Sequence, residues 1–159
     1  AVNGAAVTGG FELALGCDLL VAATTARFAD THGRVGVHPA WGLSQKLSRL
    51  IGIGRAKEMS LTGNFVDAAT AERWGLVNRV VEPDELLPAC RQLAQDMLSL
   101  DPTMLVTYKR VIDDGYAMNF GDAMALEARV ATDFNAAVSP EAVEARRRAV
   151  LERGRQQTQ

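Results

Sequence analysis

The chain contains 159 residues, with 17 Lys and Arg against 19 Asp and Glu, so its formal net charge is −2 at pH 7. This balance provides no basic surface for nucleic acid and no electrostatic attraction to an anionic membrane. Hydrophobic residues make up 48% of the sequence and charged residues 23%, as in ordinary globular domains, which excludes disordered and fibrous proteins.

The cysteine content and the lengths of the apolar runs exclude further classes of protein. Cys17 and Cys90 are too few and too widely spaced for a disulfide framework or a zinc cluster, and they predict a reducing location, the cytoplasm. The longest apolar run, at residues 13–23, is shorter than the ~20 residues that a membrane-spanning helix needs. The sequence opens on Ala1 without a Met and with the composition of a strand end, so we expect it to be part of a longer domain.

The first third of the chain predicts a β-α-β arrangement rich in glycine. Glycines among small residues at positions 4–10 indicate a tight backbone turn. Four Gly and Pro residues punctuate residues 30–44, which indicates a loop with specific backbone conformations. The expected elements are a strand end at 1–4, a helix at 11–15, and strands at 18–23 and 26–30.

From residue 43 onward the pattern is mainly helical. Leu43 and Leu47 recur at helical spacing, and glycines end three of the predicted helices. We divide the chain into a β/α core at 1–81, a helical region at 82–155 and a frayed polar tail at 156–159. The expected helices are 43–51, 53–61, 68–74 with Asp67 as its cap, 83–100, 103–113, 122–137 and 140–153, with one strand at 76–81.

The segment Thr8-Gly9-Gly10-Phe11-Glu12 carries the clearest chemical signal. Backbone N–H groups at the start of a helix have no intrahelical acceptor, and the helix dipole adds positive potential, so glycines there can receive an anion or a developing oxyanion. Glu12 follows Gly9 by nearly one helical turn, which directs a carboxylate and an amide donor toward the same group. For such a segment alone, a close-packed turn followed by a dipole-stabilised glutamate is the commoner interpretation.

The two histidines, His32 and His38, both lie in the expected loop at 30–44. Imidazole titrates near neutral pH and can act as a general acid or base. We assign His38 a structural position in the loop, whereas Asp30 precedes His32 by two residues and can orient it. No Cys-x-x-Cys or His-x-x-x-His spacing accompanies the histidines, so no metal site is predicted.

Other conspicuous residues favour structural roles. Trp41 and Trp74 are expected to pack rather than to form ligand platforms, although Trp41 lies in the same loop as the histidines. A group of arginines late in the chain is expected to form a solvated helix face, with a contact to a phosphate-bearing ligand as the sharper alternative. The arginines are Arg146, Arg147, Arg148, Arg153 and Arg155.

Taken together, the segments resemble one known family. The matching motifs, in chain order, are Ala1-Val2-Asn3-Gly4, Gly9-Gly10-Phe11-Glu12-Leu13-Ala14, Cys17-Asp18, Phe28-Ala29, Gly36, Pro39, Gly42, Leu43-Ser44-Gln45-Lys46-Leu47, Leu61-Thr62-Gly63 and Trp74-Gly75-Leu76-Val77. In this order they resemble the crotonase (enoyl-CoA hydratase/isomerase) superfamily, in particular the C-terminal portion of its domain. With this resemblance, the functional interpretation of Gly9 and Glu12 takes precedence over the structural one.

The resemblance implies an α/β fold, a partial crotonase-like spiral of ββα units followed by a C-terminal helical trimerisation region. It implies an acyl-CoA thioester as substrate, no further cofactor, and assembly as a homotrimer or a dimer of trimers. Family members stabilise an enolate oxygen with two backbone N–H groups. One of these donors matches Gly9, beside Gly10, and the other belongs to a segment that precedes this sequence. Ala40, Trp41 and Gly42 are further candidates for substrate binding.

At the catalytic positions the sequence departs from the family pattern. Glu12 matches the glutamate that activates water, whereas His32 replaces the second glutamate and Ala40 replaces a loop glycine. The resemblance implies hydration of an enoyl-CoA through an enolate. An isomerase, thioester hydrolase or decarboxylase of the same fold, or a non-catalytic acyl-CoA-binding protein, are the alternatives. Because one oxyanion donor lies outside the sequence, we expect this chain alone to be poorly active.

Overall fold

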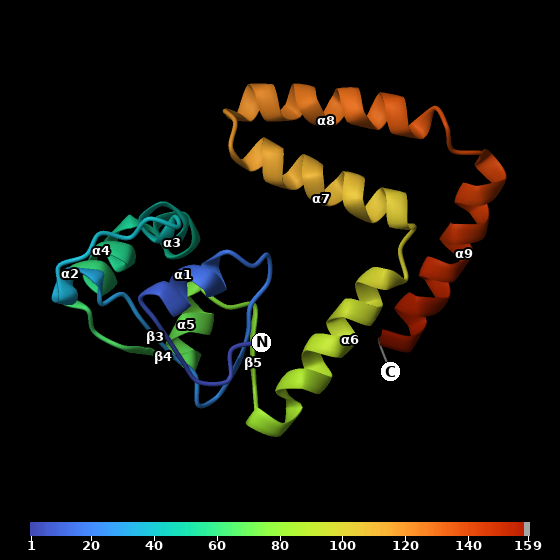
Figure 1. Cartoon of the computed structure of the whole chain (residues 1–159). Helices are drawn as coiled ribbons and strands as arrows, with labels where there is room; N and C mark the ends of the chain where they lie inside the picture. The colour runs from blue at the N-terminus through green and yellow to red at the C-terminus, as the bar shows by residue number, and fades with distance from the viewer. Residues whose placement is uncertain (158–159) are drawn as a thin grey trace. The chain divides into compact units, whose positions relative to one another are not determined.

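The computed structural model describes residues 1–157. The chain forms two compact units, residues 1–99 and residues from 100 onward, and each is described by itself (Figure 1). The sequence instead predicts a β/α core and a helical region that are separated after residue 81. That division concerns function and stays a prediction. Of the tail expected at 156–159, residues 156 and 157 belong to the last helix, and residues 158–159 lie outside the described residues.

Short strands form two small sheets in the first unit. β1 (Ala5–Val7), β3 (Arg27–Ala29) and β4 (Val66–Asp67) form one sheet in the order β1-β3-β4, with β1 parallel and β4 antiparallel to β3. β2 (Val21–Ala23) and β5 (Arg79–Val81) form a parallel pair. Because β1 and β3 run in the same direction, the segments that follow them leave from the same edge of the sheet.

Helices connect these strands, and glycines end two of them where the sequence predicts. Gly63 and Gly75 adopt φ angles of 66° and 79°, a left-handed conformation that residues with a Cβ rarely adopt. The helices of this unit are α1 (Gly9–Leu15), α2 (His32–Val35), α3 (Leu43–Ile51), α4 (Ile53–Thr62), α5 (Ala68–Trp74) and α6 (Leu86–Leu98), with a 3-10 turn, η1 (Pro83–Glu85), before α6.

The main core lies where α1 and α3 pack with the β1-β3-β4 sheet. Phe11 of α1 and Phe28 of β3 are fully buried, with ring centroids 5.7 Å apart and ring planes tilted by 53°. Leu43 and Leu47 of α3 belong to the same cluster. Since Phe11 directly precedes Glu12, this packing also fixes the rotation of α1 about its axis.

The structure differs from the predicted elements at several places in the first unit. Residues 5–7, expected within a turn, form β1 because their backbone pairs with β3. Residues 32–35, expected as loop, form the single-turn helix α2. β4 is not predicted, since a two-residue strand carries no periodicity. β5 begins only at Arg79, and the apolar residues before it are buried in the core instead.

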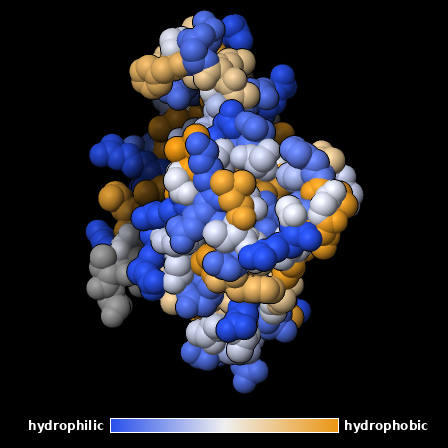
Figure 2. All heavy atoms as spheres, turned by 90° about the vertical axis from the view of Figure 1, so that its left-hand side faces the viewer, coloured by the Kyte–Doolittle hydropathy of each residue, from blue (hydrophilic) through white to orange (hydrophobic). Residues whose placement is uncertain are grey.

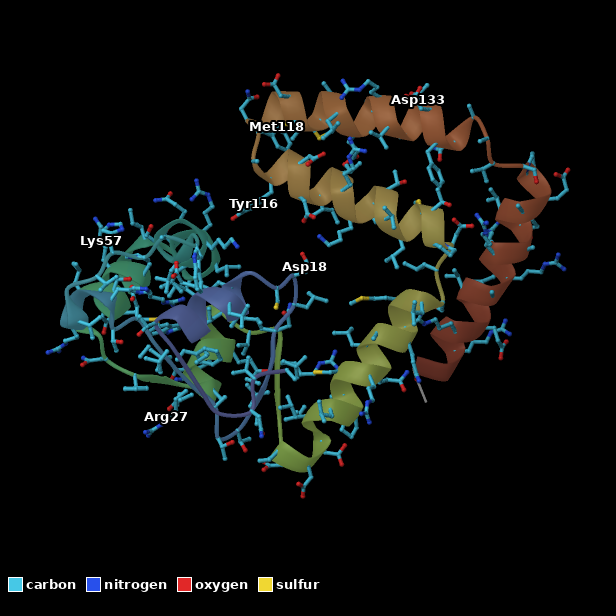
Figure 3. The ribbon with its side chains drawn as sticks, viewed as in Figure 1. Asp18, Arg27, Lys57, Tyr116, Met118 and Asp133 are labelled. Carbon is cyan, nitrogen blue, oxygen red and sulfur yellow. The ribbon has the colours of Figure 1, made fainter. Side chains whose placement is uncertain are left out.

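The second unit contains the helices α7 (Pro102–Tyr116), α8 (Phe120–Asn135) and α9 (Pro140–Gln157). α7 and α8 lie side by side, joined by a short turn that carries Met118 (Figures 1 and 3). Figure 2 shows one face of the molecule, where apolar residues form separate small patches between hydrophilic ones. None of the described helices combines the length and apolar character required to cross a membrane.

The arginines of α9 form ion pairs with nearby acids. Arg146 lies 3.0 Å from Asp101, and Arg147 lies 3.8 Å from Glu144, one turn earlier on the same helix. Arg155 pairs in the same way with Glu152, at 3.6 Å. These exposed pairs agree with the expected solvated helix face.

Phe28→Ala tests the core that supports α1. Removing a fully buried aromatic ring is expected to lower the free energy of unfolding by about 3–5 kcal/mol, through lost burial and the cavity left beside Phe11. Urea unfolding measures this loss. Phe120→Ala, at a side chain that is 82% exposed, is the matched control. A loss for Phe28→Ala no larger than that of the control would contradict this core.

Asp67 caps α5 and couples the stability of the fold to pH. The Thr70 backbone N–H donates to its Oδ1 at 2.7 Å. This hydrogen bond, followed by weaker contributions that include the charges of Arg73 and Arg27 (Figure 3), holds the pKa of Asp67 below its ordinary value of 3.8. A depressed pKa in the folded state stabilises the protein above pH 3.8, and this contribution is lost as the pH falls through the lowered pKa.

Asp67→Ala is therefore expected to lower the Tm near neutral pH, and its difference from the unmodified chain should shrink below pH 3.8. Asp67→Asn keeps an oxygen acceptor for the cap and should lose less. Thermal unfolding followed by circular dichroism across this pH range measures both. A Tm difference that grows on acidification would show that the sign assigned to Asp67 is wrong.

Candidate active site

Glu12 is held in place by backbone amides. It lies on α1 directly after Phe11, and it is only 5% exposed. Its Oε1 accepts the backbone N–H of Trp41 at 2.7 Å and that of Leu43 at 3.4 Å. Leu43 is the first residue of α3, so the carboxylate lies at the positive end of that helix dipole. One carboxylate oxygen is thus bound to the scaffold, while Oε2 faces another group.

That group is His32. Its Nε2 lies 3.5 Å from Glu12 Oε2, and the residue is 6% exposed. The two side chains meet because α1 follows β1, α2 follows β3, and these two strands are parallel neighbours. The structure therefore brings together the two residues that the sequence singles out as catalytic candidates.

Asp30 lies on the other side of the imidazole. Its Oδ1 is 2.7 Å from His32 Nδ1 and accepts the His32 backbone N–H at 3.1 Å. Asp30 is 3% exposed. It follows β3 directly, and its position two residues before His32 is the sequence signal that points to this contact. In the described part of the chain, the buried polar side chains are those of Glu12, His32 and Asp30, and they form one continuous cluster.

Gly9 and Gly10 open α1, as the oxyanion interpretation requires. The first bond of the helical ladder runs from the Glu12 N–H to the Thr8 carbonyl, at 2.9 Å. The N–H groups of Gly9 and Gly10 precede that ladder and have no acceptor within the helix. The Gly9 amide is therefore not used by the hydrogen-bond ladder of α1.

Thr8 makes the sharp turn that presents these amides. Its φ angle of 53° is unusual for a β-branched residue and indicates local strain. The Thr8 N–H donates to the Ala29 carbonyl at 3.1 Å, and its hydroxyl is hydrogen-bonded to that of Thr31. These hydrogen bonds connect the turn after β1 to the segment after β3. The same local contacts therefore position the first-turn amides of α1 and His32. Neither threonine is singled out by the sequence.

The loop before α3 shapes the other side of the site. Gly42, at φ 101°, turns the chain so that the N–H groups on both sides of it reach Glu12. The Trp41 side chain is 69% exposed, so the expected packing role is not met. Its Cζ3 atom lies 3.7 Å from the position that a Cβ on Gly9 would occupy. Ala40 is exposed at the start of this turn.

The other conspicuous residues lie outside the cluster. Trp74 packs against the core, with the Arg55 guanidinium 5.3 Å from its ring centroid, as expected for a packing residue. His38 is exposed, with Nδ1 2.9 Å from the Pro39 carbonyl oxygen. Within residues 1–157, no three His, Cys, Asp or Glu side chains are grouped as ligands for a metal ion.

A cavity of about 700 Å³ in the second unit is lined by residues of α7, α8 and α9 and their connections. It includes Asp101 and Arg146, which already pair with each other. Its lining contains the carboxylates of Asp101 and Asp133 but no imidazole, so it lacks the carboxylate–imidazole pair that Glu12 and His32 form.

The model of the enoyl-CoA hydratase/isomerase family matches residues 1–156. The chain belongs to this family. The resemblance to this family is thereby confirmed, while the assignment to the C-terminal portion of its domain stays a prediction. The structural neighbours of this family also confirm the predicted crotonase-like α/β fold. In a crystal structure of enoyl-CoA hydratase subunit I from Geobacillus kaustophilus, the match has a TM-score of 0.84 and 36% identity, and it covers 95% of this chain and 58% of that one.

Further proteins of the enoyl-CoA hydratase/isomerase family are also similar to this chain. The Arabidopsis thaliana protein named "probable enoyl-CoA hydratase 1, peroxisomal" is 49% identical over 127 residues, which are 80% of this chain and 48% of that protein. A candidate enoyl-CoA hydratase from Thermobifida fusca, in complex with acetoacetyl-CoA, matches with a TM-score of 0.80 and 28% identity over 85% of this chain and 53% of that one. The chain spans about half the length of the curated relatives it matches.

Proposed function

We propose that the protein carrying this chain adds water to the double bond of a 2-enoyl-CoA thioester. The observation that carries the proposal is the buried pair of Glu12 Oε2 and His32 Nε2, 3.5 Å apart, beside the first-turn amides of α1. Two proton-carrying groups next to a backbone donor match what hydration through an enolate requires. The names of the relatives support the reaction, and the acetoacetyl-CoA complex of the Thermobifida fusca protein supports the substrate class.

In the proposed reaction, Glu12 accepts a proton from water while the water oxygen bonds to C3 of the substrate. The electrons of the double bond move toward the thioester carbonyl, whose oxygen becomes an enolate held by the Gly9 N–H. His32 then donates a proton from Nε2 to C2, and the carbonyl re-forms. The proton on Glu12 returns to His32 Nε2, which restores the site. One such oxyanion donor typically stabilises the transition state by about 2.7–4 kcal/mol.

The substrate-binding residues have supporting parts in this proposal. Gly10 adds a second first-turn amide beside Gly9, and the Trp41 ring next to Gly9 forms one wall for the thioester. Gly42 keeps the two amides aimed at Glu12, and Ala40 lies at the rim of the loop. We assign no cofactor beyond the acyl-CoA itself, and we place the reaction in a reducing compartment, in the cytoplasm.

The helical region 82–155 is proposed to mediate assembly into a homotrimer or a dimer of trimers. Exposed apolar side chains on α7 and α8 support this, among them Val106 at 67% and Ile112 at 59% exposure. Light scattering coupled to gel filtration is expected to give three or six times the 17.1 kDa chain mass. Val106→Asp combined with Ile112→Asp should reduce that mass. A monomer at high protein concentration would contradict the assembly.

Glu12→Gln is the test of the reaction. The amide keeps an oxygen for the Trp41 and Leu43 amides but cannot accept the water proton, so the rate should fall by about 10²–10⁴-fold with little change in Tm. The measurement follows conversion of crotonyl-CoA in ¹⁸O-labelled water by mass spectrometry, which detects slow turnover. Glu58→Gln makes the same chemical change at an exposed position of α4 and should leave the rate unchanged.

The products decide between the proposed reaction and its alternatives. A labelled 3-hydroxyacyl-CoA supports hydration, and its absence would overturn the proposal. Release of free CoA would instead indicate a thioester hydrolase. A shifted double bond in crotonyl-CoA would indicate an isomerase, and loss of CO₂ from a 2-carboxyacyl-CoA supplied in a separate assay would indicate a decarboxylase. Binding of the thioester without any product would indicate a non-catalytic acyl-CoA-binding protein.

A further inference from the structure

The buried cluster contains one carboxylate that the proposed reaction does not use. Asp30 is 3% exposed, and its Oδ1 lies within hydrogen-bond distance of both the backbone nitrogen and Nδ1 of His32. A turn cap would need only the backbone contact. The Nδ1 contact, at 2.7 Å, is the shorter of the two and falls in the range of charge-assisted hydrogen bonds.

We propose that Asp30 is a positioning residue that fixes the tautomer of His32, so that Nδ1 keeps its hydrogen and Nε2 is the nitrogen that exchanges protons. This inference rests on the proposed function, since it assigns the working atom of the general acid. A carboxylate oxygen offers only acceptor sites, so the ring nitrogen facing it must carry the hydrogen. The second nitrogen is then directed at Glu12 Oε2, 3.5 Å away.

The surroundings of the ring favour this assignment. Glu12 also presents a carboxylate to the imidazole, but at 3.5 Å it competes poorly with Asp30 at 2.7 Å for the hydrogen of a neutral ring. Both bonds to Asp30 come from one residue and meet at the same oxygen, so they hold the ring relative to its own backbone. Rotation of the ring away from Asp30 would break the Nδ1 contact, while the backbone contact keeps Asp30 Oδ1 in place.

The tautomer can be observed without substrate. The chain contains two histidines, and His38→Gln removes the second, leaving one imidazole in a ¹⁵N-histidine-labelled sample. Long-range ¹H–¹⁵N correlation at alkaline pH, where the ring is neutral, distinguishes the Nδ1–H form from the Nε2–H form. The expected spectrum is that of the Nδ1–H form. An Nε2–H spectrum in this otherwise unmodified chain would overturn the proposal, whatever the variants do.

Two substitutions of Asp30 separate positioning from a merely structural role. In Asp30→Asn, the His32 backbone N–H should bind the oxygen of the new side-chain amide, because the NH₂ group cannot accept a hydrogen bond. That oxygen then lies beside Nδ1 as well, so the Nδ1–H form should persist. Asp30→Ala removes the acceptor and leaves Glu12 as the carboxylate facing the ring, so the spectrum should change to the Nε2–H form. An unchanged tautomer in a folded Asp30→Ala protein would show that Asp30 only caps the turn.

Kinetics supplies the second measurement. Asp30→Ala should lower kcat by up to about 10²–10⁴-fold, the contribution of a misdirected general acid, while KM changes little. Asp30→Asn should retain more of the rate. Asp133→Ala, at an exposed position of α8 (Figure 3), is the matched control and should alter neither the tautomer nor kcat. A loss confined to KM would contradict the proposal. If crotonyl-CoA is not hydrated at all, the proposed function fails while the tautomer measurement still decides the role of Asp30.

Discussion

The geometry of the site depends on one interaction, between Glu12 Oε1 and the backbone N–H groups at the start of α3. A carboxylate that is 95% removed from solvent needs hydrogen-bond donors to compensate for the water it loses. The amides of Trp41 and Leu43 supply them, assisted by the dipole of α3. Because one oxygen is occupied in this way, the two oxygens of Glu12 are inequivalent, and only Oε2 can take part in proton transfer with His32.

A second constraint is the parallel pairing of β1 and β3. It brings two turns to the same edge of the sheet, one leading into Gly9 and the other into His32. The strained backbone of Thr8 and its bonds to Ala29 and Thr31 couple these turns directly. The first-turn amides of α1 and the imidazole of His32 are therefore held by one local network rather than by two independent loops.

The sequence was informative where local signals and tertiary packing agree. Gly63 and Gly75 end helices at the predicted places, since a left-handed residue leaves few alternatives to glycine. Glu12 and His32 were proposed as catalytic because the family resemblance aligns them with the two catalytic positions, whereas the spacing of Glu12 to Gly9 alone favoured a structural role. β1 was missed because its backbone pairs with β3, which is distant in the chain, and α2 because a single helical turn is too short to show a periodic pattern. The exposed ring of Trp41 was likewise beyond prediction, since residue type favours burial and only the loop conformation turns it outward.

The contacts that hold Glu12, His32 and Asp30 all come from residues 8–43, well inside the first compact unit. Such short sequence separations allow the arrangement to form early during synthesis, before the last helices leave the ribosome. Because these contacts involve only residues 8–43, selection on the cluster and selection on the helices of the second unit can act separately. Substitutions in α7, α8 or α9 leave the residues that hold Glu12, His32 and Asp30 unchanged, so the helical unit can diverge while this cluster keeps its geometry.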